Sequence, residues 1–149
     1  MNRAELHDLL CEDLANEVDH MMFYLRAATE VEGLHREELR EFFLKQAREE
    51  MGHVDQFSTM ASYLGDSVGF EYTNKAWACG GNPRLILAEA SRMEQEVANN
   101  YADRLKATEA PSEGSYDPAV ATAHVFYEDQ IKDSQMTAWE LKKWLTHFS

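Results

Sequence analysis

The sequence predicts an all-α protein, an antiparallel four-helix bundle with one long crossover between its second and third helices. Apolar residues recur at a helical period in four long segments of the 149-residue chain. Three prolines and seven glycines leave these segments with few interruptions. The three connections are short, long and short, and the long one, from Asp66 to Gly81, has no sustained helical period. We expect one domain, residues 1–149.

The first two helices are expected from about Arg3 to Thr29 and from about Arg36 to Leu64. Asn2 is suited to cap the first helix. Gly33 lies between the two segments and Gly65 follows the second, where glycine commonly ends a helix. The apolar positions are Leu6, Leu10, Leu14, Met21, Leu25 and Ala28 in the first segment, and Phe42, Phe43, Ala47, Val54, Phe57, Met60, Ala61 and Leu64 in the second.

The third and fourth helices are expected to begin at Asn82–Pro83 and Asp117–Pro118. Both dipeptides combine a capping residue with proline at the first helical position. A break from Pro111 to Ser115 separates the two segments, and the fourth runs to the end of the chain. The apolar positions are Leu87, Ala90, Val97, Ala98, Tyr101 and Leu105 in the third segment, and Val125, Ile131, Ala138, Leu141 and Leu145 in the fourth.

Composition excludes several classes of function. Fourteen Lys and Arg against 27 Asp and Glu give a net charge of −13, which argues against a nucleic-acid partner. Cys11 and Cys79 are too few for a disulfide framework and favour a reducing compartment. The charged N-terminus does not resemble a signal peptide, and no apolar run approaches the roughly 20 residues of a membrane span. We therefore expect a cytoplasmic protein without a membrane partner.

Each predicted apolar stripe has an acidic residue near its middle: Glu17, Glu50, Glu94 and Glu128. His53 follows Glu50 by three residues in "REEMGHVDQF", so the two side chains are neighbours on one helix face. Buried carboxylates are costly unless they become protonated, form pairs or bind a metal. Because carboxylate oxygens with few imidazoles suit iron or manganese, we expect one of these metals.

The spacing of the acidic residues relates the two halves of the chain. Glu17 and Glu50 are 33 residues apart, and Glu94 and Glu128 are 34 residues apart. An ascending and a descending helix joined by a short turn would place each pair at one level. The sequence therefore predicts two related helical hairpins that contribute to one shared metal centre.

These residues resemble those of the ferritin-like di-iron proteins, and of bacterioferritins most closely, over nearly the whole chain. In that family two helices each provide a Glu and two others each provide a Glu-x-x-His. The resemblance implies that Glu17 and Glu94 are terminal ligands, that Glu50 and Glu128 bridge two metal ions, and that His53 caps one of them. Tyr24 matches a tyrosine that bacterioferritins place beside the centre.

The fourth helix departs from the family pattern, because Ile131 stands where the second histidine is expected. His20, in a further Glu-x-x-His, and His124, four residues before the fourth-helix glutamate, are candidate replacements. Alternatively the second metal site is weaker and partly open, as in animal-type ferritins with a Gln in the fourth helix. Gln130 or Gln135 would then contribute.

Met51, in "EMGH", matches the methionine that binds haem across a two-fold interface in bacterioferritins. Because it lies about 100° around the helix from its neighbour, it faces away from the expected centre. The alternative is a methionine that packs in a dimer interface, and we expect no haem. Apolar residues off the stripes, among them Met51, Phe23, Trp139 and Trp144, predict a homo-oligomer built on two-fold dimers.

The function expected from this resemblance is oxidation of ferrous iron by O2 or peroxide at a di-iron centre, a ferroxidase activity that serves iron storage or detoxification. One alternative is a rubrerythrin-like peroxidase without storage, which the absence of a CxxC pair disfavours. A DNA-protecting mini-ferritin is disfavoured by the acidic charge. A metal-free structural bundle is disfavoured by the inward carboxylates.

Overall fold

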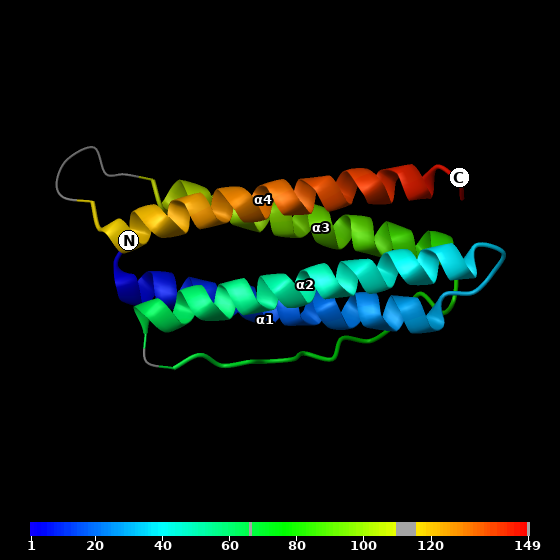
Figure 1. The fold of residues 1–149 in the computed structure, drawn as a ribbon, viewed down its shortest axis with the longest axis horizontal. Helices are drawn as coiled ribbons and strands as arrows, with labels where there is room; N and C mark the ends of the chain where they lie inside the picture. Colours follow the sequence, from blue (N-terminus) through cyan, green and yellow to red (C-terminus); the bar gives the residue numbers. More distant parts are fainter. Residues whose placement is uncertain (66, 110–115, 149) are drawn as a thin grey trace. The chain divides into compact units, whose positions relative to one another are not determined.

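The computed structural model describes residues 1–65, 67–109 and 116–148. Over these residues the chain forms four α-helices and no strand (Figure 1). The helices are α1 (Arg3–Glu30), α2 (Arg36–Leu64), α3 (Pro83–Ala107) and α4 (Pro118–Leu145). The predicted α2 matches in both bounds, and the other predicted helices are confirmed to within a few residues. The predicted break from Pro111 to Ser115 lies outside the described residues.

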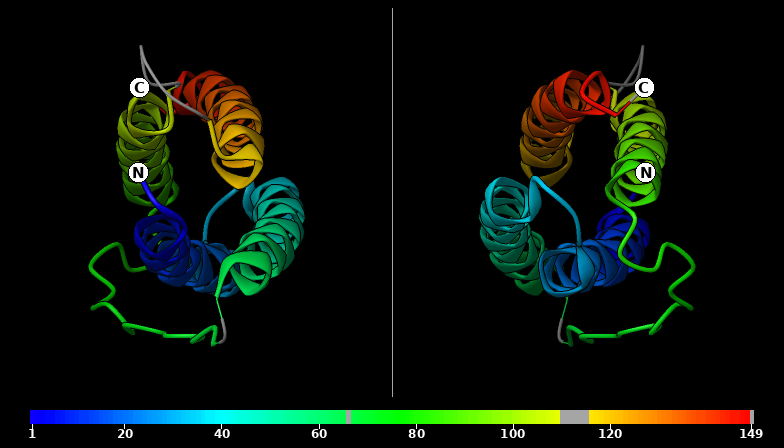
Figure 2. Two further views of the ribbon diagram at one scale, coloured as in Figure 1. Left: turned by 90° about the vertical axis from the view of Figure 1, so that its left-hand side faces the viewer. Right: turned by 90° about the vertical axis from the view of Figure 1, so that its right-hand side faces the viewer.

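The chain forms two compact units. One unit, His7–Ile86, contains most of α1, all of α2 and the crossover. The other unit joins Met1–Leu6 to Leu87–Ser149 and contains most of α3 and all of α4. Within each unit two antiparallel helices lie side by side (Figures 1 and 2). The expectation of one domain stays a prediction.

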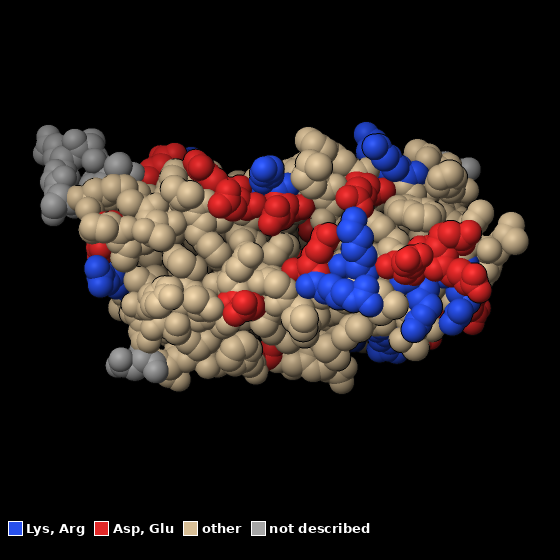
Figure 3. All heavy atoms as spheres, in the orientation of Figure 1, with Lys and Arg blue, Asp and Glu red and all other residues tan. Residues whose placement is uncertain are grey.

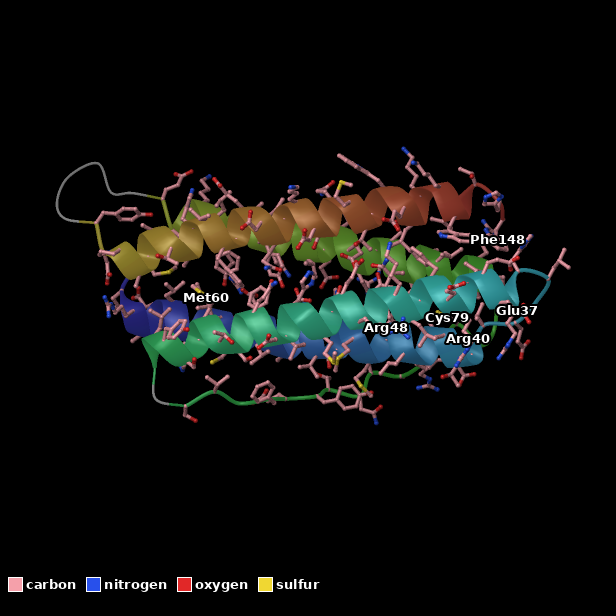
Figure 4. The ribbon with its side chains drawn as sticks, viewed as in Figure 1. Glu37, Arg40, Arg48, Met60, Cys79 and Phe148 are labelled. Atoms are coloured by element: carbon pink, nitrogen blue, oxygen red, sulfur yellow. The ribbon has the colours of Figure 1, made fainter. Side chains whose placement is uncertain are left out.

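The first unit buries one face of each of its helices. The fully buried side chains recur every three or four residues, which is the spacing of a single helix face. At the turn between the helices, the Arg40 guanidinium donates to the carbonyl oxygen of Ala28 at 2.9 Å (Figure 4). This bond ties the start of α2 to the end of α1. The buried apolar side chains include Leu10, Leu14, Tyr24, Ala27 and Ala28 on α1 and Leu39, Phe42, Phe43, Ala47, Phe57 and Ala61 on α2.

His7 contacts the chain on both sides of the end of α2. Its Nδ1 lies 2.9 Å from the carbonyl oxygen of Ala61, and its Nε2 lies 2.8 Å from that of Ser67. Gly65 has an extended backbone with φ of −157°, which any residue can adopt. A Cβ atom at Gly65 would, however, lie 2.5 Å from Nδ1 of His7. Glycine is therefore required here by the close approach of the imidazole ring.

The crossover follows α1, as Figures 1 and 2 show. The backbone N–H of Thr73 donates to Oδ1 of Asp19 at 3.0 Å. The Trp77 ring lies 5.4 Å from the Phe23 ring and 5.1 Å from the Arg26 guanidinium carbon, distances at which ring packing and cation–π attraction operate. The prediction of a long non-helical connection is confirmed for residues 67–81, Asp66 lies outside the described residues, and the contacts of this segment shield part of the α1 surface.

The second unit packs α3 against α4 through buried apolar and aromatic side chains. Tyr101 and Tyr127 are almost fully buried, and their ring centroids lie 5.6 Å apart. Such aromatic pairs add about 0.5–1.5 kcal/mol beyond their burial of surface. Other buried apolar residues of this unit are Leu87, Ala90, Val97 and Ala98 on α3 and Val120, Ala123 and Leu141 on α4.

The three predicted N-terminal caps are confirmed. Asn2 Oδ1 accepts from the backbone N–H of Glu5 at 2.8 Å, and Glu5 Oε2 accepts from the N–H of Asn2 at 3.0 Å, which together form a capping box. Asn82 Oδ1 accepts from a backbone N–H three residues later at 3.2 Å. Asp117 Oδ1 accepts from the backbone N–H two residues later at 2.9 Å. Each cap satisfies a donor that the first helical turn leaves unpaired.

Asp117 also pairs with Arg3 through two hydrogen bonds of 2.9 and 3.1 Å. The Arg3 hydrogen bond, aided by that of the Ala119 backbone, lowers the pKa of Asp117. We predict that Asp117→Ala lowers the Tm by a few degrees at neutral pH, because it removes the cap and the ion pair together. Asp117→Asn keeps a capping oxygen and should lose less. A Tm of Asp117→Ala equal to that of the wild type in calorimetry would contradict this assignment.

Charged side chains of both signs are interleaved on the face that Figure 3 shows, where basic residues form no extended patch.

None of the helices in the described part of the chain combines the length and apolar character needed to cross a membrane.

Candidate metal centre

Glu17 of α1 and Glu50 and His53 of α2 come together inside the first unit. His53 Nδ1 lies 3.3 Å from Glu50 Oε2 and 3.5 Å from Glu17 Oε2. One ligand atom from each residue lies within 4.8 Å of the others. Glu17 and Glu50 are buried, and the His53 side chain is 14% exposed. The structure therefore joins the three residues that the sequence proposed for this hairpin, and their role as ligands stays a prediction.

The helix register explains why these carboxylates are buried. Asp13, Glu17, His20 and Tyr24 follow one another on α1 at intervals of four, three and four residues, and all four are buried. On α2, Gln46 is likewise buried four residues before the glutamate of the cluster. Polar side chains therefore continue the apolar face of each helix. Asp13 and Gln46 were missed in the sequence, although their spacing of four residues from the cluster places them on the same face.

The charges of the cluster stabilise one another. Burial alone would raise the pKa of Glu17, but hydrogen bonding with Glu50 and His53 and the nearby charges of His20 and His53 outweigh it and lower this pKa to about 2. Burial alone would lower the pKa of His53, but hydrogen bonds and charge interactions with Glu17 and Glu50 raise it to about 11. In the metal-free protein the His53 imidazolium therefore lies beside the ionised Glu17 carboxylate and hydrogen-bonds to Glu50.

The donor set fits a first-row divalent metal ion. Oxygens from two carboxylates converge on one imidazole nitrogen, so a cation that displaces the imidazole proton would meet two oxygens and one nitrogen. Oxygen donors with a single imidazole suit iron or manganese, whereas thiolates would favour zinc or iron–sulfur clusters. Metal uptake must release the His53 proton and will therefore depend on pH.

The metal-free protein should be most stable in mildly acidic solution. Because the pKa of His53 is raised from 6.5 to about 11, its contribution is complete below pH 6.5 and is lost as the pH rises towards 11. Because the pKa of Glu17 is lowered from 4.5 to about 2, its contribution is complete above pH 4.5 and is lost as the pH falls towards 2. We predict a Tm maximum between these limits in the presence of a chelator. His53→Gln should flatten the alkaline decline, and an unchanged decline would contradict this origin.

Three further candidates lie in the first unit. His20 and Tyr24 are buried, and Tyr24 packs against Phe23 and Phe43 with ring centroids 5.5 and 6.4 Å away. Met51 is 60% exposed. Its exposure agrees with a position away from the cluster, and its role as a haem ligand or an interface residue stays a prediction.

In the second unit Glu94 is buried, as expected, but the expected inward orientation of Glu128 is wrong. The Glu128 side chain is 56% exposed, and Oε1 lies 3.6 Å from Nε2 of His124, whose side chain is 26% exposed. The buried face of α4 instead contains Ala123, Tyr127, Gln130, Ser134 and Thr137. Glu128 follows a buried tyrosine by one residue and therefore points about 100° away from that face.

Gln130 is the polar side chain that takes the inward position on α4 at this level of the helix. Its burial is compatible with the alternative in which a fourth-helix glutamine replaces the second histidine, which stays a prediction. Ile131 is only partly buried, and the buried residues Tyr127 and Gln130, three residues apart, each lie one residue before the expected positions Glu128 and Ile131. Glu94 and Gln130 stay predicted contributors to metal binding.

Comparison with known proteins supports this chemistry. The ferritin-like domain of the ferritin family matches residues 7–149. A crystal structure of ferritin-like, diiron-carboxylate proteins from Bacillus anthracis str. Ames is 26% identical and covers 96% of each chain, with a TM-score of 0.81. No curated protein matches the chain. The structural likeness confirms the predicted all-α, four-helix fold class. From the sequence match and the structural likeness together, we conclude that this chain belongs to the ferritin family and contains a ferritin-like domain.

Proposed function

We propose that this protein oxidises ferrous iron, with O2 or peroxide as the oxidant, and that Glu17, Glu50 and His53 bind the iron. The buried convergence of two carboxylates on His53 Nδ1 carries the proposal, because it provides ligands of the right type in one place. Membership of the ferritin family and likeness to a diiron-carboxylate protein support it. Iron is the preferred metal of the proposal, with manganese as an alternative.

The protein contributes ligands, orientation and exclusion of water. The glutamates supply negative charge that binds ferrous iron and stabilises the higher charge of the ferric product. His53 contributes its nitrogen after its proton has been displaced. Two ferrous ions supply two electrons, which with two protons convert O2 to hydrogen peroxide. We propose Glu94 as a further carboxylate ligand and Gln130 as a neutral, weaker donor, so that two iron ions bind with unequal affinity.

The test is aerobic oxidation of Fe2+ by the purified, chelator-treated protein. We expect oxidation well above the rate in buffer, with a fast phase that saturates at about two Fe2+ per chain, the stoichiometry of a di-iron site. A parallel assay with hydrogen peroxide under anaerobic conditions identifies the preferred oxidant. Rates equal to those of buffer with both oxidants would refute the proposal. Release of the ferric product into solution would indicate detoxification, and retention of that product in a particle would indicate storage.

We further propose that the protein acts in the cytoplasm as a homo-oligomer built on two-fold dimers. Several large apolar side chains are exposed in the chain, including Met51 at 60% and Trp139 at 59%. We predict that multi-angle light scattering at micromolar concentration gives a mass of at least two chains. Trp139→Glu should shift the mass downwards if this residue lies in an interface. A wild-type mass of one chain would contradict the prediction.

A further inference from the structure

His124 and Glu128 form a polar pair on the solvent-facing side of α4. They are four residues apart, so their side chains are neighbours on one helix face. His124 Nε2 lies 3.6 Å from Glu128 Oε1, and the two side chains are 26% and 56% exposed. The pair is therefore open to solvent, unlike the buried cluster of Glu17, Glu50 and His53.

The opposite side of the imidazole is fixed by Thr108, which directly follows α3 and is fully buried. The Thr108 hydroxyl donates to two carbonyl oxygens of α3, that of Leu105 at 2.9 Å and that of Arg104 at 3.1 Å. Its oxygen lies 3.1 Å from His124 Nδ1. Because the hydroxyl hydrogen is directed to the carbonyls, this oxygen accepts, and Nδ1 carries the hydrogen. The Tyr116 hydroxyl also donates to the backbone carbonyl oxygen of Thr108, and this bond helps to hold Thr108 in place.

This arrangement leaves the lone pair of a neutral His124 on Nε2, the ring nitrogen that lies 3.6 Å from the Glu128 carboxylate. The 3.6 Å separation is too long for an N–H···O hydrogen bond. It is close to the N···O separation of about 3.4 Å between two ligands of a tetrahedral metal ion with bonds of about 2.1 Å. A histidine whose other nitrogen donates to a protein oxygen is the usual arrangement at metal sites, because that bond fixes the tautomer and the ring orientation.

We propose that His124 Nε2 and the Glu128 carboxylate form a second divalent-cation site, with water completing the coordination. The imidazole nitrogen selects first-row ions such as Fe2+, Co2+ or Zn2+ over Mg2+ and Ca2+. The net charge of −13 raises the local concentration of such cations. Thr108 is a positioning residue that acts through His124. The proposal does not depend on metal binding by the buried cluster.

Calorimetric titration of the full chain with Co2+ tests this site, with cobalt absorption as a second readout. His124→Ala and Glu128→Gln should each remove one Co2+ from the stoichiometry or lower its affinity more than tenfold. Thr108→Val should lower the affinity about tenfold, as loss of an outer hydrogen-bond partner does at other metal sites. Thr108→Ser keeps the hydroxyl and should restore binding. Glu140→Gln, another α4 carboxylate, is the matched control and should change nothing.

His53→Ala separates the two sites, because it should remove cobalt from the buried cluster and leave the α4 site intact. Unchanged cobalt stoichiometry and affinity in both His124→Ala and Glu128→Gln would overturn the proposal and reduce the pair to an ordinary ion pair. Both substitutions fall on partly exposed side chains, and circular dichroism will verify that α4 is retained. An unchanged affinity in a folded Thr108→Val protein would overturn the positioning role.

Discussion

His53→Ala is expected to slow aerobic oxidation of Fe2+ by more than tenfold and to lower the affinity of the first iron. The substitution removes the imidazole nitrogen that lies 3.3 Å from Glu50 Oε2 and 3.5 Å from Glu17 Oε2. Loss of a group that only supports a metal ligand costs about 10–100-fold in affinity or activity, so loss of a ligand itself should cost at least as much. Stopped-flow absorbance measures the rate, and anaerobic Fe2+ titration measures the affinity.

His147→Ala provides a matched control, since His147 is an exposed histidine beyond the end of α4 and should leave the oxidation rate unchanged. Glu50→Gln should resemble His53→Ala, because an amide retains the size of the side chain but removes its charge. A His53→Ala protein that folds and oxidises Fe2+ at the wild-type rate would mean that the reaction takes place elsewhere.

Phe43→Ala is expected to lower the free energy of unfolding by about 3–5 kcal/mol, the usual cost of deleting a buried aromatic ring. Phe43 is fully buried on α2, and its ring stacks on Tyr24 of α1 at a centroid distance of 6.4 Å. The substitution should leave a cavity between the two helices. Urea denaturation followed by circular dichroism measures the change in free energy.

Phe43→Leu is the conservative comparison and should lose much less stability, because it retains most of the apolar volume. Leu34→Ala removes a side chain that is 93% exposed and should change stability by less than about 0.5 kcal/mol. A loss below about 1 kcal/mol in Phe43→Ala would contradict tight packing of α1 on α2 at this position.

The helix bounds could be predicted because local signals determine them. Asn82 and Asp117 each precede a proline, and both side chains accept a backbone hydrogen bond in the first turn. Gly65 ends α2 where the sequence predicted, but for a reason that sequence does not reveal. The imidazole of His7, nearly 60 residues away in the chain, occupies the space that a Cβ atom at this position would need. Such long-range contacts do not appear in a local pattern.

The site could be predicted in the first unit because its residues continue regular helix faces. Glu50 and His53 are neighbours on α2, and Glu17 lies on the α1 face that also buries Leu10 and Leu14. Leu25, assigned to that face from the sequence, is 41% exposed, because the neighbouring Tyr24 takes the buried position. Burial of the larger aromatic side chain removes more apolar surface from water.

The predicted buried face of the fourth helix was wrong because polar residues lie on the face that is buried. Its buried face includes the polar residues Gln130, Ser134 and Thr137, whereas Val125, which the predicted stripe included, is 56% exposed. A register chosen by hydrophobicity therefore follows the wrong face. That choice made Glu128 an inward ligand and Ile131 the residue at the histidine position. A functional helix that places polar groups inside the protein weakens the periodic signal used to orient it.

Iron anomalous scattering from crystals soaked anaerobically in Fe2+ tests the central claim most directly. We predict a strong peak at about 2.0–2.3 Å, the bond length of first-row metal sites, from His53 Nδ1 and from oxygens of both Glu17 and Glu50. His53→Ala crystals treated in the same way should lose this peak. Iron bound elsewhere in the wild-type protein, with no peak between His53 and these two carboxylates, would contradict iron binding by Glu17, Glu50 and His53.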